Sequence, residues 1–172
     1  IAENEIKNNI DAYVEQSTIT AEGAVSIGAS STATVDALSI GGSAAVSSGE
    51  LTLSLSGAGA GTTNTIDNDI KAQVSQGAVI TTTNNATVAV TATDDSKIIA
   101  DAGGVAIAAT LGSSAGIAAS VGASVAVNQI GKGRGHSVQA LVDGATINSE
   151  GDVTIAASSD ATIDGLSFAG AG

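Results

Sequence analysis

Apolar residues recur along this chain in a pattern that is written three times. The first copy runs from Ile10 to Leu38, and the same spacing returns without a gap from Val138 to Leu166, 128 positions later. The apolar positions of these two copies are Ile10, Val14, Ile19, Val25, Ile27, Val35 and Leu38, then Val138, Val142, Ile147, Val153, Ile155, Ile163 and Leu166. The tandem copies predict a repeat protein.

A looser copy lies between these two. Its apolar positions are Ile70, Val74, Val79, Val88, Val90 and Ile98. The offset from the first copy is 60 at Ile70 and 63 at Val88, so we expect a small insertion near Asn84–Asn85. We therefore predict one continuous domain over 1–172, with repeats at approximately 1–61, 62–124 and an incomplete 125–172.

Within each copy, apolar and polar residues alternate, which predicts half-buried β-strands of about five residues. The pairs Val25/Ile27, Val88/Val90 and Val153/Ile155 share one position of the repeat and are expected to face inward. Val35 and its neighbours Ala33 and Ala37 are expected to face inward as well. The same alternation in 50–56, ELTLSLS, predicts that its three leucines also point into the core.

The segment 1–14 is ambiguous, because its apolar residues are four apart and fit either a helix face or a strand. The related copies decide the matter. Asn4, Asn64 and Asn128 correspond, and the third copy continues with GKGRGHS, whose glycines a helix interior would resist. We predict strand, turn and strand here. The small apolar segment 103–127 predicts either strands buried on both faces or a close approach of backbones.

Short strands, frequent turn signals and tandem copies predict an all-β fold, a parallel β-helix or β-solenoid, because each unit covers the hydrophobic end of the last. A sandwich or barrel would not require such copies. With coils of roughly 20 residues, each unit would supply about three coils and the chain would form a rod of some 40 Å. On that basis Asn4, Asn64 and Asn128 are too widely spaced for an uninterrupted asparagine ladder, and inward turns are their expected place.

The amino-acid composition limits the classes of partner that this chain is expected to bind. Apolar residues make up 43% of the chain, yet only Tyr13 and Phe168 are aromatic, which suits narrow stacked strands. The net charge of −12 includes only 5 basic residues, so nucleic acid is a poor partner. No apolar run approaches the roughly 20 residues of a membrane span, so no membrane insertion is expected. The start within a repeat suggests an excerpt of a longer chain.

The phrase VAVNQI followed by VQALVDGATINSEGDVTIAASSDATI resembles the repeats of giant bacterial surface proteins, the filamentous haemagglutinin-like adhesins and related "β-strand repeat" proteins. The resemblance covers nearly the whole chain. It rests on the three asparagines, on Ala12, Ala72 and Ala140, and on the Val-x-Ile or Val-x-Val pairs. It implies a right-handed parallel β-helix, secretion, and a place at the bacterial cell surface as stalk or fibre, and it leaves the secretion route open.

Catalytic and binding motifs are sparse. GSSAG at 112–116 fits the G-x-S-x-G pattern with Ser114 as nucleophile, but no helix pattern follows it and the only histidine is His136. We therefore predict no enzyme. Lys132, Arg134 and His136 form the only basic cluster of the sequence. It predicts either a solvated insertion between coils or, as the weaker alternative, a loop that binds anions or surface glycans.

Acidic pairs are the other candidate chemistry. Glu3/Glu5, Asp67/Asp69 and Asp94/Asp95 offer carboxylate oxygens of the kind that calcium prefers, but none fits an EF-hand loop and their places in the repeat differ. Charge that discourages sideways strand pairing is the better interpretation. We predict no cofactor, with calcium as a weak alternative, and a glycosidase-type carboxylate pair stays open although the chain lacks aromatic platforms.

The sequence thus favours a mechanical role. We expect a structural stalk or fibre-forming segment of a secreted or cell-surface bacterial protein, whose partner is itself, end to end, or the rest of a longer chain. The alternative is a glycan or host-surface binding module on the same solenoid, acting through Lys132, Arg134 and His136. A third reading is a fragment of a polysaccharide-active enzyme.

Overall fold

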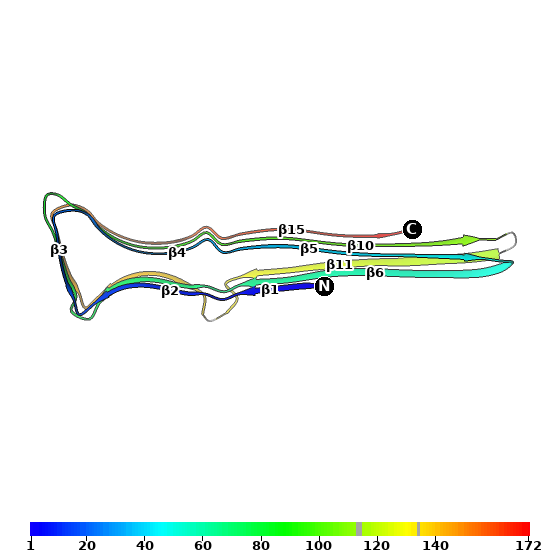
Figure 1. The fold of residues 1–172 in the computed structure, drawn as a ribbon, viewed down its shortest axis with the longest axis horizontal. Coiled ribbons are helices and arrows are strands. Elements are labelled where there is room, and N and C mark those ends of the chain that lie inside the picture. Colours follow the sequence, from blue (N-terminus) through cyan, green and yellow to red (C-terminus); the bar gives the residue numbers. More distant parts are fainter. Residues whose placement is uncertain (113–114, 134) are drawn as a thin grey trace.

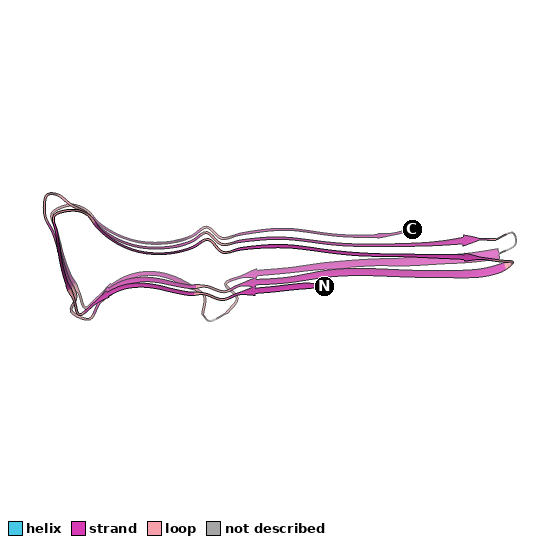
Figure 2. Cartoon of the chain, viewed as in Figure 1, coloured by secondary structure: helices cyan, strands magenta, loops and turns pink. Residues whose placement is uncertain are grey.

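The chain folds as an all-β parallel solenoid, as the repeats predict. The computed structural model describes residues 1–112, 115–133 and 135–172. All strand pairs are parallel and in register, and they form five three-stranded sheets. Figure 2 shows these described residues as strands and loops without a helix. The strand reading of 1–14 is confirmed, because Ala2–Ile6 (β1) and Asn9–Glu15 (β2) are strands. The turn expected between them is a two-residue kink at 7–8, after which the chain continues along the same side (Figure 1).

The remaining strands follow in chain order and repeat the same series. The first coil continues with β3 (Thr18–Ala21), β4 (Val25–Ser31) and β5 (Thr34–Ser48). The middle coil holds β6 (Leu51–Ile66), β7 (Asp69–Ser75), β8 (Val79–Thr82), β9 (Val88–Asp94) and β10 (Lys97–Leu111). The last coil holds β11 (Ala115–Ile130), β12 (Ser137–Asp143), β13 (Thr146–Ser149), β14 (Val153–Ser159) and β15 (Thr162–Ala171).

One coil of this solenoid takes a whole sequence repeat, and the expectation of coils of roughly 20 residues is wrong. Asn4 lies beside Asn64, which lies beside Asn128, so successive coils are 60 and 64 residues apart along the chain. Only three coils stack, and at about 4.8 Å per strand the stack is about 10 Å between its outer coils. The long axis of the molecule lies across the coils (Figure 1), so the expected 40 Å rod along the stack is also wrong.

The coils differ in length at their corners while the strands stay in register. Gln16, Gln76 and Gly144 all have positive φ, at 46°, 54° and 59°, at the corner that follows β2, β7 and β12. The insertion expected near Asn84–Asn85 is confirmed, because the offset between paired residues of the first two coils rises from 61 at Thr18 and Val79 to 63 at Val25 and Val88. Both asparagines adopt positive φ in the turn between β8 and β9. The register pairs Ile19 with Ile80, so the position expected for Val79 shifts by one residue.

Each coil has two parts, which we call the head and the arm. The head consists of β2–β4, β7–β9 and β12–β14, where three short sheets enclose a core (Figure 1). In the arm, the sheet β5–β10–β15 faces the sheet β1–β6–β11, and the two run side by side to a turn at the tip. The longest strands have 15 and 16 residues and belong to the arm, which exceeds the expected length of about five.

The head encloses an aliphatic core, as alternation predicts. Ile27, Ile70, Val74, Val88 and Val90 are buried there, and the last four are fully buried because they lie in the middle coil. Burial of each such side chain contributes ~1.5–3 kcal/mol. At the base of the arm, Val35 and Ala37 join a second buried cluster with Ile66 and Ile98.

The arm has an interior of small side chains, and here the sequence prediction fails. Leu51, Leu53 and Leu55 were expected to face inward, but they point to solvent, while Thr52 and Ser54 are buried. The two sheets approach so closely that a Cβ at Gly41 would overlap the carbonyl oxygen of Gly59. Leucine side chains do not fit in that space, so the register places them outside.

Hydroxyl groups join the two sheets across the arm. The Ser43 and Ser56 hydroxyls are 2.7 Å apart, and the Ser54 hydroxyl donates to the carbonyl of Ala45 at 2.8 Å. The close backbone approach expected in 103–127 is confirmed, since a Cβ at Gly104 would overlap the carbonyl oxygen of Ala123. The alternative expectation for that segment, burial on both faces, is wrong, because its outward side chains are exposed.

Neighbouring glycines of β5 test this packing. Gly41→Ala should lower the free energy of unfolding by about 1–3 kcal/mol, because the new methyl group overlaps the opposite backbone. Gly42→Ala is the matched control, since a Cβ there meets nothing within 4 Å. Denaturant unfolding of both variants measures the difference. Equal stability of the two variants would contradict the close approach of the sheets.

Candidate functional site

A ladder of asparagine side chains crosses all three coils inside the base of the arm. The Asn4 Nδ2 donates to the Oδ1 of Asn64 at 2.8 Å, and the Asn64 Nδ2 donates to the Oδ1 of Asn128 at 2.8 Å. Asn64 is fully buried and has both neighbours as partners. The expectations of inward turns and of no uninterrupted ladder are wrong, because each coil supplies one asparagine on a strand.

The ladder ends on unlike atoms at the two faces of the stack. At the first coil, Asn4 uses its amide nitrogen and leaves the Oδ1 as an acceptor. At the last coil, Asn128 accepts through its Oδ1, and within the described residues its Nδ2 makes no hydrogen bond. One end of the solenoid therefore presents an acceptor, and the other end presents a donor at the same place in the coil.

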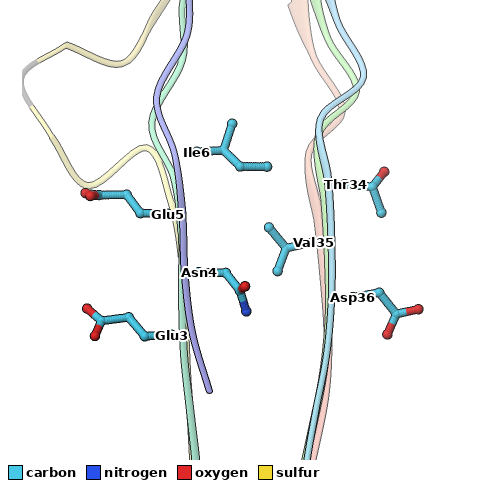
Figure 3. Close-up of a pocket in the computed structure, with 7 residues that line it drawn as sticks. All are labelled: Glu3, Asn4, Glu5, Ile6, Thr34, Val35 and Asp36. Atoms are coloured by element: carbon cyan, nitrogen blue, oxygen red, sulfur yellow. The ribbon is translucent and has the colours of Figure 1, made fainter. Parts of the chain in front are cut away.

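The end of the stack at the first coil is hollow around this acceptor. Asn4, Ile6 and Val35 point into the space between β1 and β5, whereas Glu3 and Asp36 point away from it (Figure 3). The hollow has a volume of about 470 Å³ and is lined from the first coil alone. It is a recess in which further side chains can pack.

The end of the stack at the last coil exposes apolar side chains instead. Val153 and Ile155 are 45% and 49% exposed, while their register partners Val88 and Val90 are fully buried. Ile27, at the same position of the first coil, is only 7% exposed. In the sheet β4–β9–β14 this core position is therefore covered on the first coil and uncovered on the last, so the two ends of the solenoid differ there. In the sheet β2–β7–β12, by contrast, Ile10 of the first coil and Val138 of the last are both half-buried.

A buried polar cluster lies where the head meets the arm. The Nδ2 of Asn68 donates to the hydroxyl oxygens of Ser31 and Ser96 at 3.0 and 3.1 Å, and Ser96 donates to the Oδ1 of Asp94. Asn68, Asp94 and Ser96 are fully buried, and the Asn68 Oδ1 and the Asp94 Oδ2 have no hydrogen-bond partner. The sequence analysis did not predict this cluster. The signal for it was Asp94, an aspartate that stands between the apolar residues of two strands.

The basic loop expected to bind ligands lies beside carboxylates. Lys132 is exposed, His136 is half-buried, and Arg134 lies outside the described residues. The backbone N–H of Gly133 donates to the Oδ1 of Asp67 at 3.3 Å, which holds the loop against the first turn of the middle coil. Glu5, Lys7, Asp67, Lys132 and Gly133 all line one cleft of about 380 Å³.

The charges in that cleft have both signs. Lys7 pairs with Glu5 at 2.6 Å, and this is the only ion pair within 1–112, 115–133 and 135–172. The side-chain hydrogen bond to Glu5, with the carboxylate charge, raises the pKa of the Lys7 amine. Asp67 lines the same cleft as Lys7 and Lys132. A purely anionic ligand would meet these carboxylates as well as the lysines.

The acidic pairs do not come together into one site. Glu3 and Glu5 point outward from β1, and Asp69 accepts a hydrogen bond from the hydroxyl of Ser137. Asp94 is buried while Asp95 is exposed. In the described part of the chain, no group of three or more histidine, cysteine or acidic side chains could hold a metal ion. Ser114 of the GSSAG motif lies outside the described residues.

Comparison with protein-family models, with curated proteins and with solved structures gave no match to this chain. A search of the described residues found no helix long and apolar enough to cross a membrane.

The ladder predicts a large effect at its central member. Asn64→Ala should lower the free energy of unfolding by about 2 kcal/mol or more, because it leaves the Asn4 donor and the Asn128 acceptor without a partner. Asn9→Ala removes only an exposed side-chain hydrogen bond to Asp11 and should change stability by less than about 0.5 kcal/mol. Chemical denaturation of both variants compares them; equal losses would show that the ladder contributes nothing.

The buried cluster predicts a stabilising substitution. Asp94→Asn should raise the free energy of unfolding by about 1–3 kcal/mol, because it removes a buried carboxylate oxygen that has no partner. The new amide can still accept the hydrogen bond from Ser96 through its oxygen. Asp95→Asn, on the exposed neighbour, is the control and should be close to neutral. A fall in thermal stability for Asp94→Asn would contradict this account.

Proposed function

We propose that this chain is a structural element that stacks end to end, coil on coil, as a stalk or fibre. The single observation that carries the proposal is the pair of unlike ladder ends. When the last coil of one copy meets the first coil of the next, the Nδ2 of Asn128 faces the Oδ1 of Asn4. The ladder then continues across the junction with the same donor and acceptor at each step.

The apolar groups at the two ends support the same arrangement. The uncovered Val153 and Ile155 of one copy would lie against the half-buried Val25 and the buried Ile27 of the next, as Val88 and Val90 do within the chain. Such a contact joins two different surfaces, so it repeats without closing and yields an open filament. Unpaired strand edges on both outer coils supply the main-chain hydrogen bonds.

The acidic charge on the sides of the coils favours growth along the stack over lateral association. The chain carries a net charge of −12, and the acidic side chains Glu3 and Asp36 point out from the sides of the coil. Like charge on the sides opposes random lateral contact, while the interior of each coil end is apolar or amide-lined. The repeat pattern, similar to that of bacterial surface adhesins, supports a secreted or cell-surface setting for such a fibre.

A second candidate function rests on the connection between β11 and β12, whose described residues 131–133 and 135–136 protrude from the solenoid beside β1 (Figure 1). Under this reading the solenoid displays the loop to a glycan or host surface. Lys132→Ser combined with Arg134→Ser and His136→Ser should abolish glycan binding while leaving filament growth unchanged. A glycan array read with the wild type and this triple variant separates display from a purely mechanical role.

The stacking proposal is tested by charging the end of the last coil. Val153→Lys with Ile155→Lys should stop growth, because both side chains would be buried at the junction although they are half exposed in a single chain. Thr154→Lys is the matched control, since this residue lies between them on the outward face. Electron microscopy and sedimentation velocity over a concentration series measure filament length. Growth of the double variant equal to that of the wild type would refute the proposal.

A further inference from the structure

Carboxylates on the outward sides of the coils are kept apart along the stack. In the strand pairs of the described residues, no acidic side chain lies in register beside another acidic side chain. Asp36 of β5 and Asp164 of β15 share one column, with Ile99 of β10 between them. Both aspartates are exposed, and Asp36 points away from the interior of the arm (Figure 3). Within one chain, two strand spacings of together about 10 Å separate the two backbones.

A second column in the head has the same arrangement. Glu15 of β2 and Asp143 of β12 lie at its two ends, with Ser75 of β7 between them. The Glu15 Oε1 accepts hydrogen bonds from the Nε2 of Gln73 at 3.0 Å and from the hydroxyl of Ser75 at 3.4 Å. A neutral residue of the middle coil therefore separates the two carboxylates of this column as well.

Stacking of two copies removes this separation. When the last coil of one copy lies on the first coil of the next, in the register of the asparagine ladder, Asp164 comes directly beside Asp36. In the same way Asp143 comes directly beside Glu15. The backbones of each pair are then about 4.8 Å apart, and like charges at this range repel each other. Every junction of the proposed filament therefore contains two carboxylate pairs that a single chain does not contain.

The strands of the two outer coils contain no lysine or arginine that could compensate these pairs. The two lysines that lie on strands belong to the middle coil. Lys71 is in register with Asp11, and Lys97 is in register with Thr34 and Thr162. Both lysines are thus paired with positions inside the chain, and stacking brings no strand lysine to the junction.

The charged groups that flank the first column lie on β10, the strand that pairs with both β5 and β15. Lys97 and Asp101 stand two residues before and two residues after Ile99, so both lie on the outward side of the sheet. The Asp101 Oδ1 accepts a hydrogen bond from the backbone N–H of Leu166 at 3.2 Å. One flanking charge of each sign leaves the repulsion at the junction without compensation.

The second column is flanked by uncharged side chains. On β7, Gln73 and Ser75 face it, and Lys71 lies four residues before Ser75, beside Asp11. On β2, the nearest ionisable side chain on the same side of the strand is Tyr13, and a phenol carries no charge between about pH 5 and pH 7. The charge at this position of the junction therefore comes from the carboxylate pair itself.

We propose that the junction between stacked copies is an acid-sensitive switch. Its two carboxylate pairs slow filament growth at neutral pH, and growth is released when acid protonates one carboxyl of each pair. This inference rests on the proposed stacking and concerns its regulation. A junction binds protons that separate chains do not bind, so linkage favours the filament as the pH falls. The release should begin above the ordinary range of carboxyl titration, about pH 4, because a proton shared by two close carboxylates is held more tightly.

Removal of the pairs tests the assignment. For the wild type, the lowest protein concentration that gives filaments should be about tenfold lower at about pH 5 than at about pH 7, because two repulsive contacts are relieved at each junction. Asp143→Asn with Asp164→Asn removes both pairs, so this variant should form filaments at the lower concentration at both pH values. Both residues are exposed, so the substitutions leave the fold of the single chain intact. Sedimentation velocity and electron microscopy measure growth.

A matched double variant controls for the loss of net charge. Asp152→Asn with Asp160→Asn removes two exposed carboxylates from the same coil. The counterparts of these residues in the first coil are the neutral Ala24 and Thr32, because Val153 is in register with Val25 through Val88, and Thr162 is in register with Thr34 through Lys97. This variant should keep the wild-type difference between the two pH values.

Reversal of the charge inverts the expected pH dependence. Asp143→Lys with Asp164→Lys turns both repulsions into attractions to Glu15 and Asp36 of the next copy. Protonation of those two carboxylates then weakens the junction, so this variant should form filaments at a lower concentration at about pH 7 than at about pH 5. The wild-type direction of pH dependence in this variant would overturn the switch.

The remaining outcomes separate the switch from stacking itself. Wild-type filaments that grow equally at both pH values, or wild-type pH dependence in Asp143→Asn with Asp164→Asn, would overturn the switch and leave stacking intact. Absence of filaments from all of these chains at both pH values would overturn stacking, and the switch with it. Acid-induced assembly of the Val153→Lys, Ile155→Lys variant would place the effect of acid away from the coil end and would also overturn the switch. The isoelectric point of about 4.1 lies below both pH values, so the chains stay negatively charged throughout.

Discussion

Main-chain hydrogen bonding between identical positions of successive coils is the constraint on which this structure depends. Every strand of the middle coil pairs in register with a strand below and above, so a residue lies beside its counterpart in the next repeat. Side chains that share a repeat position therefore stack in columns. A column of valines makes core, a column of asparagines makes a ladder, and a column of leucines outside makes an apolar ridge.

The periodicity of the sequence was enough to predict the solenoid, because stacking of counterparts requires an in-register repeat. It also located the inward pairs Val25/Ile27 and Val88/Val90 correctly. The coil length could not be predicted from the same pattern, because alternation indicates which way a side chain points but does not indicate where the chain completes one coil. Asn4, Asn64 and Asn128 carried that information, because a ladder at 2.8 Å demands one coil per asparagine.

The leucines show why the rest could not be predicted. In 51–55, alternation is perfect, and hydrophobicity alone assigns Leu53 to the interior. The assignment reverses because the opposite sheet presents Gly41 and Ser43 at short range, and the space between the sheets admits only small side chains. Which face is inward thus depends on a strand far away in the chain. The burial of Asp94 has a similar cause. It results from the position of this residue in the middle coil and not from its neighbours in sequence.

The size of the coil has a mechanical consequence. In a solenoid with short turns, force along the stack would release a short piece of chain at each rupture. Here a coil that peels from the stack frees 60 to 64 residues at once, which can extend by about 200 Å. A stack of such coils would lengthen in a few large steps under load and would dissipate work at each one, so a fibre built from it would yield gradually before it broke.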